Sequence, residues 1–436
     1  MDADATITAV GRDLFRTCAP FRASILELDK VYVAATGSSM IEIGLFTDTV
    51  TETKDPLGDP WPIAITLPAL TMLQLALVDT LAAIGVAPDV VIGHSAGETA
   101  VLSASGSASK AMALEIAIAR GRAMALLEKA DGTMAAVSCS PEEACRIIAE
   151  VHAELGEGTL TIGCYNTPAA VTLSGAESHI DLAVKKASAA GIFARKLRTR
   201  IPVHSGLMEL CHAEFEKLVE EVFSRYPVSA PVVETYSTKT GGLLAGTLDA
   251  QYFWDGTLGP VRFTEAITAL AAAHNHATYV EIGPHPVLTS YIASMTEKNT
   301  LVTCPLRRQR APEPGAEAAE LLTAVGKLVV AGHNCVNFDV LTGGAKLSGK
   351  APQYPFAPKT VPWRTQSAQI VRQLQHRNGP LNYSQLQVNV HTHPDLADHI
   401  IKGEPIMPAA GFIEMVRFSI RPRSIPRMLM LVFPGL

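Results

Sequence analysis

Apolar residues recur at helical spacing over residues 66–84, and a compact apolar run follows at residues 89–93. The intervening Gly85-Val86-Ala87-Pro88 is expected to end the helix, because glycine and proline break helical backbone. The apolar run predicts a short buried strand. A further helix is expected after the stretch at 93–98, and another over residues 109–129. Strand, tight turn and helix in this order indicate an α/β fold.

A different pattern fills residues 132–198. Period-two runs predict strands and helical spacing predicts helices, in the order strand, helix, strand, strand, helix, strand. The expected strands are 133–139, 159–165, 170–174 and 192–197, and the expected helices are 141–155 and 176–190. This βαββαβ order is the ferredoxin-like arrangement. We therefore expect a small subdomain inserted in the larger α/β domain.

The chain is expected to return to the large domain after residue 198 and to leave it near residue 305. Residues 307–314 are charged and contain proline, as linkers often are, and residues 316–331 predict a helix. Four prolines at 352–363 predict an extended segment. The predicted organisation is a large domain over 1–305 with the insert at about 132–198, a linker over 306–365, and a further domain over 366–436.

Composition narrows the class of protein. A chain of 436 residues that is 48% hydrophobic can bury more than one core. The net charge of -6 is spread without long runs, so no nucleic-acid surface is expected. Seven scattered cysteines without a CxxC pair favour reduced thiols in a cytoplasmic protein over disulfides or a metal site. The acidic start gives no sign of a secretory signal, and the apolar run at 62–78 favours a core helix over a membrane span.

The stretch Gly93-His94-Ser95-Ala96-Gly97 fits the pattern G-x-S-x-G between the predicted strand and helix. Such an elbow needs small neighbours because the turn is sharp and strains the serine backbone. The turn lifts the Ser95 hydroxyl out of the fold and points the first helix amides, beginning at Ala96, toward a reacting carbonyl. Ser95 is therefore the predicted nucleophile.

A serine nucleophile needs a base, and the chain has 13 histidines. His94 adjoins Ser95 but should point elsewhere on the elbow. His204 follows a predicted strand, in Pro202-Val203-His204-Ser205. The residues alone leave the choice open, because a histidine in a loop is more often a surface residue.

Several ordered stretches resemble the signature of malonyl-CoA:acyl-carrier-protein transacylases and of the acyltransferase domains of polyketide and fatty acid synthases. They are Thr66-Leu67-Pro68-Ala69-Leu70, Gly93-His94-Ser95-Ala96-Gly97-Glu98, Arg120-Gly121-Arg122-Ala123-Met124, Asn166-Thr167-Pro168, Val203-His204-Ser205-Gly206-Leu207-Met208, Phe253-Trp254-Asp255 with Pro260-Val261-Arg262-Phe263, and Glu281-Ile282-Gly283-Pro284. The resemblance covers about residues 8–305. It implies an α/β, hydrolase-like parallel-sheet domain that carries the ferredoxin-like insert.

The resemblance also implies roles. Ser95 would be the nucleophile, His204 the general base, and Arg120 the partner of the free carboxylate of a malonyl group, with His94 and Ala96 beside the substrate. A guanidinium matches a carboxylate bidentately and stays charged when buried. A backbone carbonyl, rather than an acid, would hold the base. Asn166 would be either a site residue or a turn former, and we favour the turn former. Malonyl-CoA would be the donor and the phosphopantetheine thiol of an acyl carrier protein the acceptor, with no metal and no bound cofactor.

Residues 399–408, His399-Ile400-Ile401-Lys402-Gly403-Glu404-Pro405-Ile406-Met407-Pro408, fit H-x-x-x-G-x-x-x-x-P. This stretch resembles the first, hot-dog half of a polyketide synthase dehydratase. In that family the histidine accepts the α-proton of a 3-hydroxyacyl thioester, so His399 would be a half-site. The sequence as a whole resembles a fungal, iterative, highly reducing polyketide synthase, and the other domains of such a synthase would be partners.

The chain departs from the family at both ends. The family's first strand and its Gly-Gln-Gly turn, which supplies an oxyanion donor, are not found before residue 10, and the sequence after Ser419 no longer resembles a dehydratase. We therefore expect no dehydratase activity from this chain. Three alternatives stay open: malonyl against methylmalonyl as the acyl group, a serine esterase that uses Asp255 and His285, and a truncated synthase fragment without activity.

Overall fold

The computed structural model describes residues 10–47, 61–308, 313–341, 344, 398–406 and 428–432, the last of these by their backbone. The chain divides into two compact units. The first comprises residues 1–344 together with 426–436, and the second comprises residues 345–425. The extended segment predicted at 352–363 lies outside the described residues.

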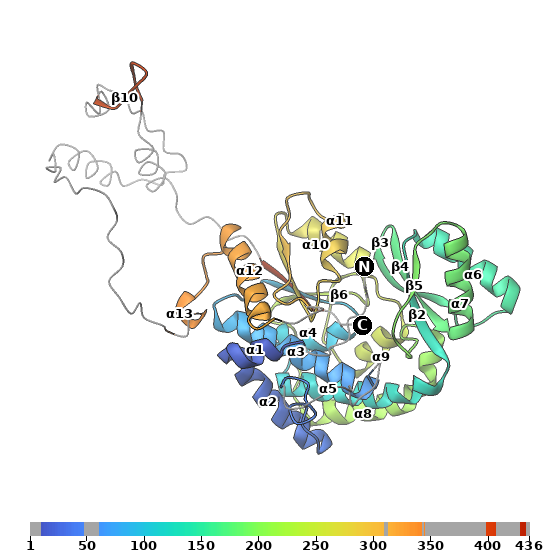
Figure 1. Ribbon diagram of the computed structural model, residues 1–436. Coiled ribbons are helices and arrows are strands. Elements are labelled where there is room, and N and C mark those ends of the chain that lie inside the picture. Colours follow the sequence, from blue (N-terminus) through green and yellow to red (C-terminus); the bar gives the residue numbers. More distant parts are fainter. Residues whose placement is uncertain are drawn as a thin grey trace. The chain divides into compact units, whose positions relative to one another are not determined.

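The first unit is built on a six-stranded sheet in the order β7-β6-β1-β12-β8-β9 (Figure 1). Its strands are β1 (Val90–Gly93), β6 (Glu234–Ser237), β7 (Gly242–Leu243), β8 (Thr278–Ile282), β9 (Val302–Thr303) and β12 (Met428–Val432). All neighbours are parallel except β6 and β7. The described residues of β1 and β8 are fully buried, as strands with helices on both faces must be. The predicted parallel-sheet domain is therefore confirmed.

Helices flank this sheet in the first unit. They are α1 (Arg12–Thr17), α2 (Ala19–Thr36), α3 (Ile63–Ala83), α4 (Glu98–Ala104), α5 (Lys110–Met124), α8 (His212–Arg225), α9 (Ala250–Leu258), α10 (Phe263–Ala273), α11 (Thr289–Met295), α12 (Ala316–Val330) and α13 (Phe338–Leu341). Helix α3 packs against α2 and α5, and its middle residues are buried on every side. Within the described residues, α3 alone is long and apolar enough to cross a membrane, and 67% of that apolar window is buried. This burial is what the sequence predicted for a core helix.

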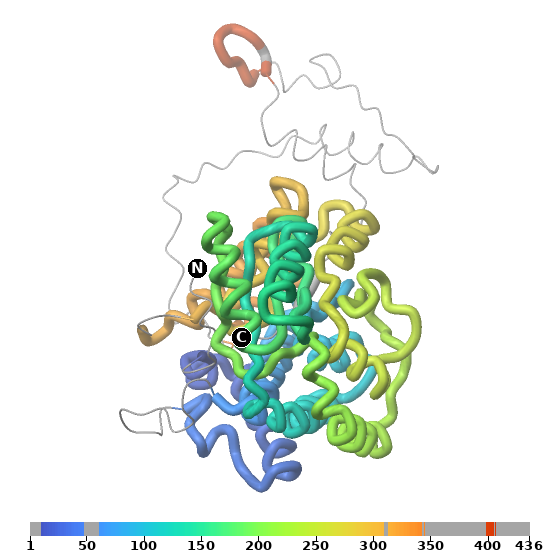
Figure 2. Tube along the Cα trace, turned by 90° about the vertical axis from the view of Figure 1, so that its right-hand side faces the viewer, coloured from blue at the N-terminus to red at the C-terminus, as the bar shows by residue number. Residues whose placement is uncertain are grey.

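The insert forms a second sheet in the order β3-β4-β2-β5, with every pair antiparallel. Its elements are β2 (Gly132–Val137), α6 (Pro141–Leu155), β3 (Thr161–Thr167), β4 (Ala170–Ala176), α7 (Glu177–Ala189) and β5 (Ala194–Lys196). Figure 2 turns this part of the molecule toward the viewer, with α6 and α7 side by side. The strand order is the ferredoxin-like one, so the sequence prediction for this segment is confirmed.

Helices α1 and α12 cap each other. Glu317 in α12 accepts the amide hydrogens of Gly11 and Leu14 at 2.7 and 3.0 Å. Asp13 in α1 accepts those of Gly315 and Ala318 at 3.0 and 3.3 Å. A carboxylate at a helix start satisfies amides that have no partner within the helix and meets the positive end of its dipole. Residues far apart in the chain thus hold the two helix starts together.

We expect Glu317→Ala to lower the free energy of unfolding by about 2–4 kcal/mol, because two buried amides lose their acceptor. Urea unfolding followed by circular dichroism measures this. Glu320→Ala on the same helix is the matched control, since Glu320 pairs only loosely with Arg307 at 3.9 Å. Equal losses in the two variants would contradict the capping role.

The described first unit does not end where the sequence placed its boundary. Leu321, Val325 and Leu328 of α12 belong to the main hydrophobic core, so this predicted linker helix is part of the large domain. At the other end of the chain, β12 lies between β1 and β8. Residues 428–432 therefore belong to the sheet of the first unit and not to the dehydratase segment predicted over 366–436, because their backbone pairs with both neighbours.

Candidate active site

The nucleophile elbow follows β1. Ser95 has a φ of 55°, the left-handed conformation that costs energy for a residue other than glycine. A Cβ at Gly93 would meet the Cα and backbone nitrogen of Glu98 at 2.7 Å, so the elbow needs glycine there. The single turn Ser95–Gly97 then leads into α4. The sequence prediction of a strained serine in an elbow that needs small neighbours is confirmed.

Ser95 lies against His204. The Oγ of Ser95 is 2.7 Å from Nε2 of His204, and Nδ1 of the same ring is 2.8 Å from the carbonyl oxygen of Gly259. A carbonyl only accepts, so Nδ1 carries the proton and Nε2 is free to accept the serine proton. Burial, with Arg120 and His94 nearby, lowers the pKa of His204 to about 3, so the ring is a neutral base at physiological pH.

Arg120 and Ser95 line the same pocket. It is buried in α5, with only 3% of its surface exposed, which rules out a solvated helix residue. Its two terminal nitrogens donate to the hydroxyls of Thr99 and Thr257, and the guanidinium lies 5.7 Å from the ring centre of Phe253. The buried Nε has no acceptor among the described residues. One donor of the fork is therefore available to a ligand.

His94 points away from Ser95. Its Nε2 is 3.0 Å from the side-chain oxygen of Asn166, whose amide nitrogen donates to Thr172 at 3.0 Å. The ring meets Phe263 edge-on at 5.2 Å. Asn166 lies inside β3, so its interpretation as a turn former is wrong: it joins the insert to the elbow. His94 thus links the elbow to the insert through Asn166. Ala96, directly after the nucleophile, is half-buried.

Sequence reasoning missed several members of this site. The carbonyl of Gly259, the hydroxyls of Thr99 and Thr257, and the carboxylate of Glu98 carry no motif that announces their role. Only Glu98 had a usable signal, because it follows the G-x-S-x-G stretch directly and would be buried at the helix start. Of these residues, Glu98 lines a pocket together with Ser95 and Arg120, and its volume of about 10 Å³ is roughly the room of one water molecule.

His399 lies in the second unit. It precedes a short antiparallel pair formed by β10 (Ile400–Ile401) and β11 (Glu404–Pro405). Its Nδ1 donates to the carbonyl oxygen of Ile406 at 2.6 Å. Met407 and Pro408, the end of the predicted stretch, lie outside the described residues.

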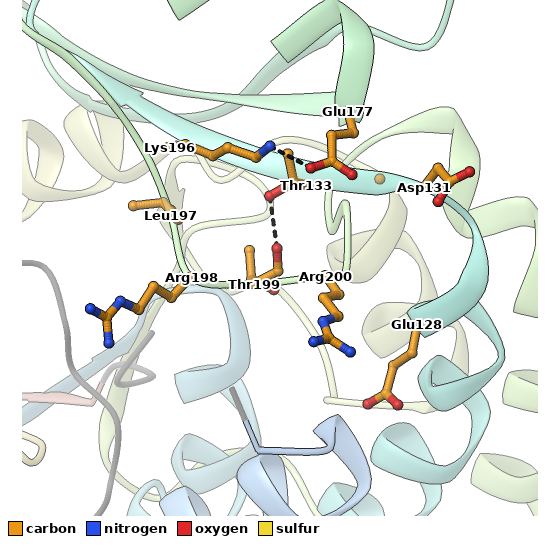
Figure 3. A pocket seen from close by; sticks show the side chains of 10 residues that line it. Glu128, Asp131, Thr133, Glu177, Lys196, Leu197, Arg198, Thr199 and Arg200 are labelled. Atoms are coloured by element: carbon orange, nitrogen blue, oxygen red, sulfur yellow. Dashed lines mark hydrogen bonds and ion pairs between the residues drawn. The ribbon is translucent and has the colours of Figure 1, made fainter. Parts of the chain in front are cut away.

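A larger pocket, of about 530 Å³, lies where the chain leaves the insert (Figure 3). Lys196 turns toward Glu177, and the hydroxyl of Thr133 donates to the backbone oxygen of Thr199 at 2.7 Å (Figure 3). Three carboxylates and three cations line it: Glu128, Asp131, Glu177, Lys196, Arg198 and Arg200. This mixed charge gives it no preference for one sign of ligand, and Ser95 does not line it.

A parallel-sheet domain with a strained serine, a neutral histidine and a helix start at the elbow defines an enzyme that works through a serine ester. The chain belongs to the acyl transferase domain family, whose pattern matches residues 7–352. It is an acyltransferase domain.

Relatives and solved structures agree with this family. The highly reducing polyketide synthase stpks1 of Strobilurus tenacellus is 46% identical over 414 residues, which are 93% of this chain and 15% of that protein. The highly reducing polyketide synthase alnA of Emericella nidulans is 30% identical over 93% of this chain and 18% of its own length. The chain thus spans less than a fifth of these relatives.

The acyltransferase domain from the second module of the salinomycin polyketide synthase superposes with a TM-score of 0.65 at 29% identity, covering 77% of this chain and 73% of that one. FabD from Acinetobacter baumannii shares the fold, with a TM-score of 0.61 at 21% identity over 76% of this chain and 96% of its own. The fold expectation of the sequence is confirmed for the acyltransferase part.

Proposed function

We propose that this domain moves a malonyl group from coenzyme A to the phosphopantetheine thiol of an acyl carrier protein. The observation that carries the proposal is that Ser95, hydrogen-bonded to the base His204, lines one pocket together with Arg120, whose buried Nε has no acceptor among the described residues. Ser95, activated by His204, can form an acyl ester. Arg120 favours acyl groups that end in a carboxylate. The reaction requires no metal and no redox cofactor.

The chemistry follows from the two hydrogen bonds of His204. Nε2 takes the Ser95 proton while Oγ adds to the thioester carbonyl, and the amide of Ala96 faces the resulting oxyanion. The imidazolium, steadied by the Gly259 carbonyl, then gives the proton to the leaving thiolate of coenzyme A. The carrier thiol reverses these steps: its proton goes to Nε2, its sulfur takes the acyl group, and Ser95 recovers its proton.

The larger setting is part of the same proposal. The named relatives are polyketide synthases, so we infer an acyl carrier protein and other synthase domains as partners, and a cytoplasmic location. Residues from 366 to about 425 would be the first segment of a dehydratase, with His399 as its proton acceptor. Asp255 is paired with Lys239 at 2.5 Å, and the histidine that reaches Ser95 is His204 rather than His285, which disfavours the esterase alternative.

Peptide mapping tests the proposal. The purified chain is mixed with malonyl-CoA without carrier protein, quenched in acid and digested, and the malonyl group is located by mass spectrometry. We expect it on the peptide that contains Ser95, and its removal when a carrier protein with a free thiol is added. A folded chain that carries no malonyl group, or carries it elsewhere, would refute the proposal.

The arginine should set the acyl preference. We expect Arg120→Gln to slow acylation by malonyl-CoA about a hundredfold, about 2.7 kcal/mol, because a buried charge partner of the carboxylate is lost. Acylation by acetyl-CoA should change little. Arg122→Gln is the matched control, since Arg122 lies in the same helix and donates to the backbone oxygen of Ala35 at the surface. Equal losses for both thioesters would show that Arg120 only supports the fold.

A further inference from the structure

A second buried charge shares the pocket with Arg120. Glu98, the first residue of α4, is 6% exposed. One carboxylate oxygen accepts the amide hydrogen of Thr238 at 3.1 Å and faces the Thr238 hydroxyl at 2.8 Å, and the other faces the Tyr252 hydroxyl at 3.0 Å. Glu98 and Arg120 line the same pocket without a direct hydrogen bond and stabilise each other's charge through space.

The hydroxyls around Glu98 suit both of its protonation states. The Tyr252 oxygen is 2.6 Å from the Ser237 hydroxyl, and the Thr238 hydroxyl also reaches the carbonyl oxygen of Gly93 at 2.9 Å. When Glu98 is ionised, the tyrosine and threonine hydrogens turn toward it. When it is protonated, its own hydrogen points to the Tyr252 oxygen, and the two hydroxyls donate to Ser237 and Gly93 instead. No heavy atom has to move.

The net charge in the pocket depends on the protonation state of Glu98. Glu98 and Arg120 are both buried, so their charges are poorly screened by water. With Glu98 ionised, Arg120 and Glu98 cancel. A malonyl carboxylate adds a negative charge, which leaves two carboxylates for one guanidinium unless a proton enters. We infer that Glu98 is the resident counter-charge of Arg120 and takes up one proton from solvent when a carboxylate-bearing acyl group binds there; this rests on the proposed function of Arg120.

The surrounding groups leave Glu98 free to do this near neutral pH. Burial raises the pKa of Glu98 to about 7, against the hydrogen bonds of Thr238 and Tyr252 and the charge of Arg120. Burial keeps the pKa of Tyr252 well above 10 and those of His94 and His204 below 6.5, so these three stay neutral. Lys239 lies 5.2 Å from the Tyr252 ring and is paired with Asp255.

The direction of the pH dependence of binding follows from proton linkage. The pKa of Glu98 is about 7 in the free chain and higher once a second carboxylate is bound. Between these two values, binding takes up a proton, so affinity falls as the pH rises. Full coupling gives a loss of about tenfold per pH unit above about pH 7. Below the lower value the proton is already present, and affinity is constant.

Binding to the Ser95→Ala chain tests this without acyl transfer. Affinities for malonyl-CoA and acetyl-CoA are measured by calorimetry from about pH 6 to about pH 9, in buffers with different heats of ionisation, which report proton uptake directly. We expect malonyl-CoA to bind with proton uptake and a falling affinity above about pH 7. Acetyl-CoA carries the same nucleotide without the carboxylate, and should show neither.

Two further substitutions in the Ser95→Ala background assign the proton. Glu98→Gln should remove both the pH slope and the proton uptake. Tyr252→Phe deletes one donor to the ionised carboxylate, so the slope should begin at higher pH. A flat malonyl-CoA profile, or a slope that survives Glu98→Gln, would overturn the inference; should the glutamine variant not fold, an unshifted onset in Tyr252→Phe would do so. Failure of the proposed function looks different: malonyl-CoA and acetyl-CoA would bind alike at every pH.

Discussion

Replacing Ser95 by alanine is expected to reduce acylation from malonyl-CoA by on the order of 10⁶-fold, below detection by intact mass. No other hydroxyl is within hydrogen-bond reach of His204 in the part of the chain that the structure describes. The amide of Ala96 and the guanidinium of Arg120 would remain, but they stabilise an ester that can no longer form. Intact-mass spectrometry of the two chains after the same exposure to malonyl-CoA measures the difference.

The control must separate chemistry from folding. Ser103→Ala makes the same change on α4, eight residues beyond the nucleophile, and should keep the adduct. Circular dichroism should show the same melting curve for both variants and the parent, because Ser95 is only half-buried. An adduct that persists on Ser95→Ala would place the nucleophile elsewhere and remove the basis for the assigned roles of His204 and Arg120.

Shortening the chain to end at residue 425 is expected to cost on the order of 5–10 kcal/mol, as much as a whole domain's stability. Strand β12 pairs with four residues of β1 and five of β8, so its loss would expose the inner edges of both strands. Since β1 leads into the elbow, the position of Ser95 would be lost too. Soluble yield and thermal unfolding of the shortened chain measure the effect.

Ending the chain after Val432 instead keeps β12 and is the matched control. Met430→Pro gives a milder version, because Met430 pairs with Val91 on one side and Val280 on the other, and proline removes its amide hydrogen. A synthetic peptide of residues 426–436 should restore part of the melting transition of the shortened chain. If the chain that ends at 425 melts like the parent, β12 does not stabilise the sheet.

Local pattern carried much of the fold prediction. The helix at Pro141–Leu155 begins and ends as predicted, because Ser140, which accepts the amide hydrogen of Glu143, and Gly156 mark its ends in the sequence. The elbow was predictable because Gly93 has no room for a side chain. Strand β12 was not, since its place depends on pairing with strands more than 140 residues earlier in the chain, for which short-range periodicity holds no information.

The residues of the active site also differ in how far the sequence could reveal them. Ser95 was found from its neighbours in sequence, and His204 and Arg120 only through resemblance. The Gly259 carbonyl could not be found, because any residue supplies a carbonyl and only the fold brings this one to His204. Asn166 was misjudged because a Thr-Pro pair follows it, which is typical of a turn, whereas its side chain is used across the insert boundary.

The mutual capping of α1 and α12 bears on module exchange. Acyltransferase units are natural candidates for transplantation between synthases, and a junction near residue 305 would directly follow β9. Such a cut would discard α12 and strand the Gly11 and Leu14 amides without Glu317. A graft that carries its own α1 and α12, together with residues 426–436 for β12, keeps both the mutual caps and the sheet, so a recipient synthase need not supply a matching helix.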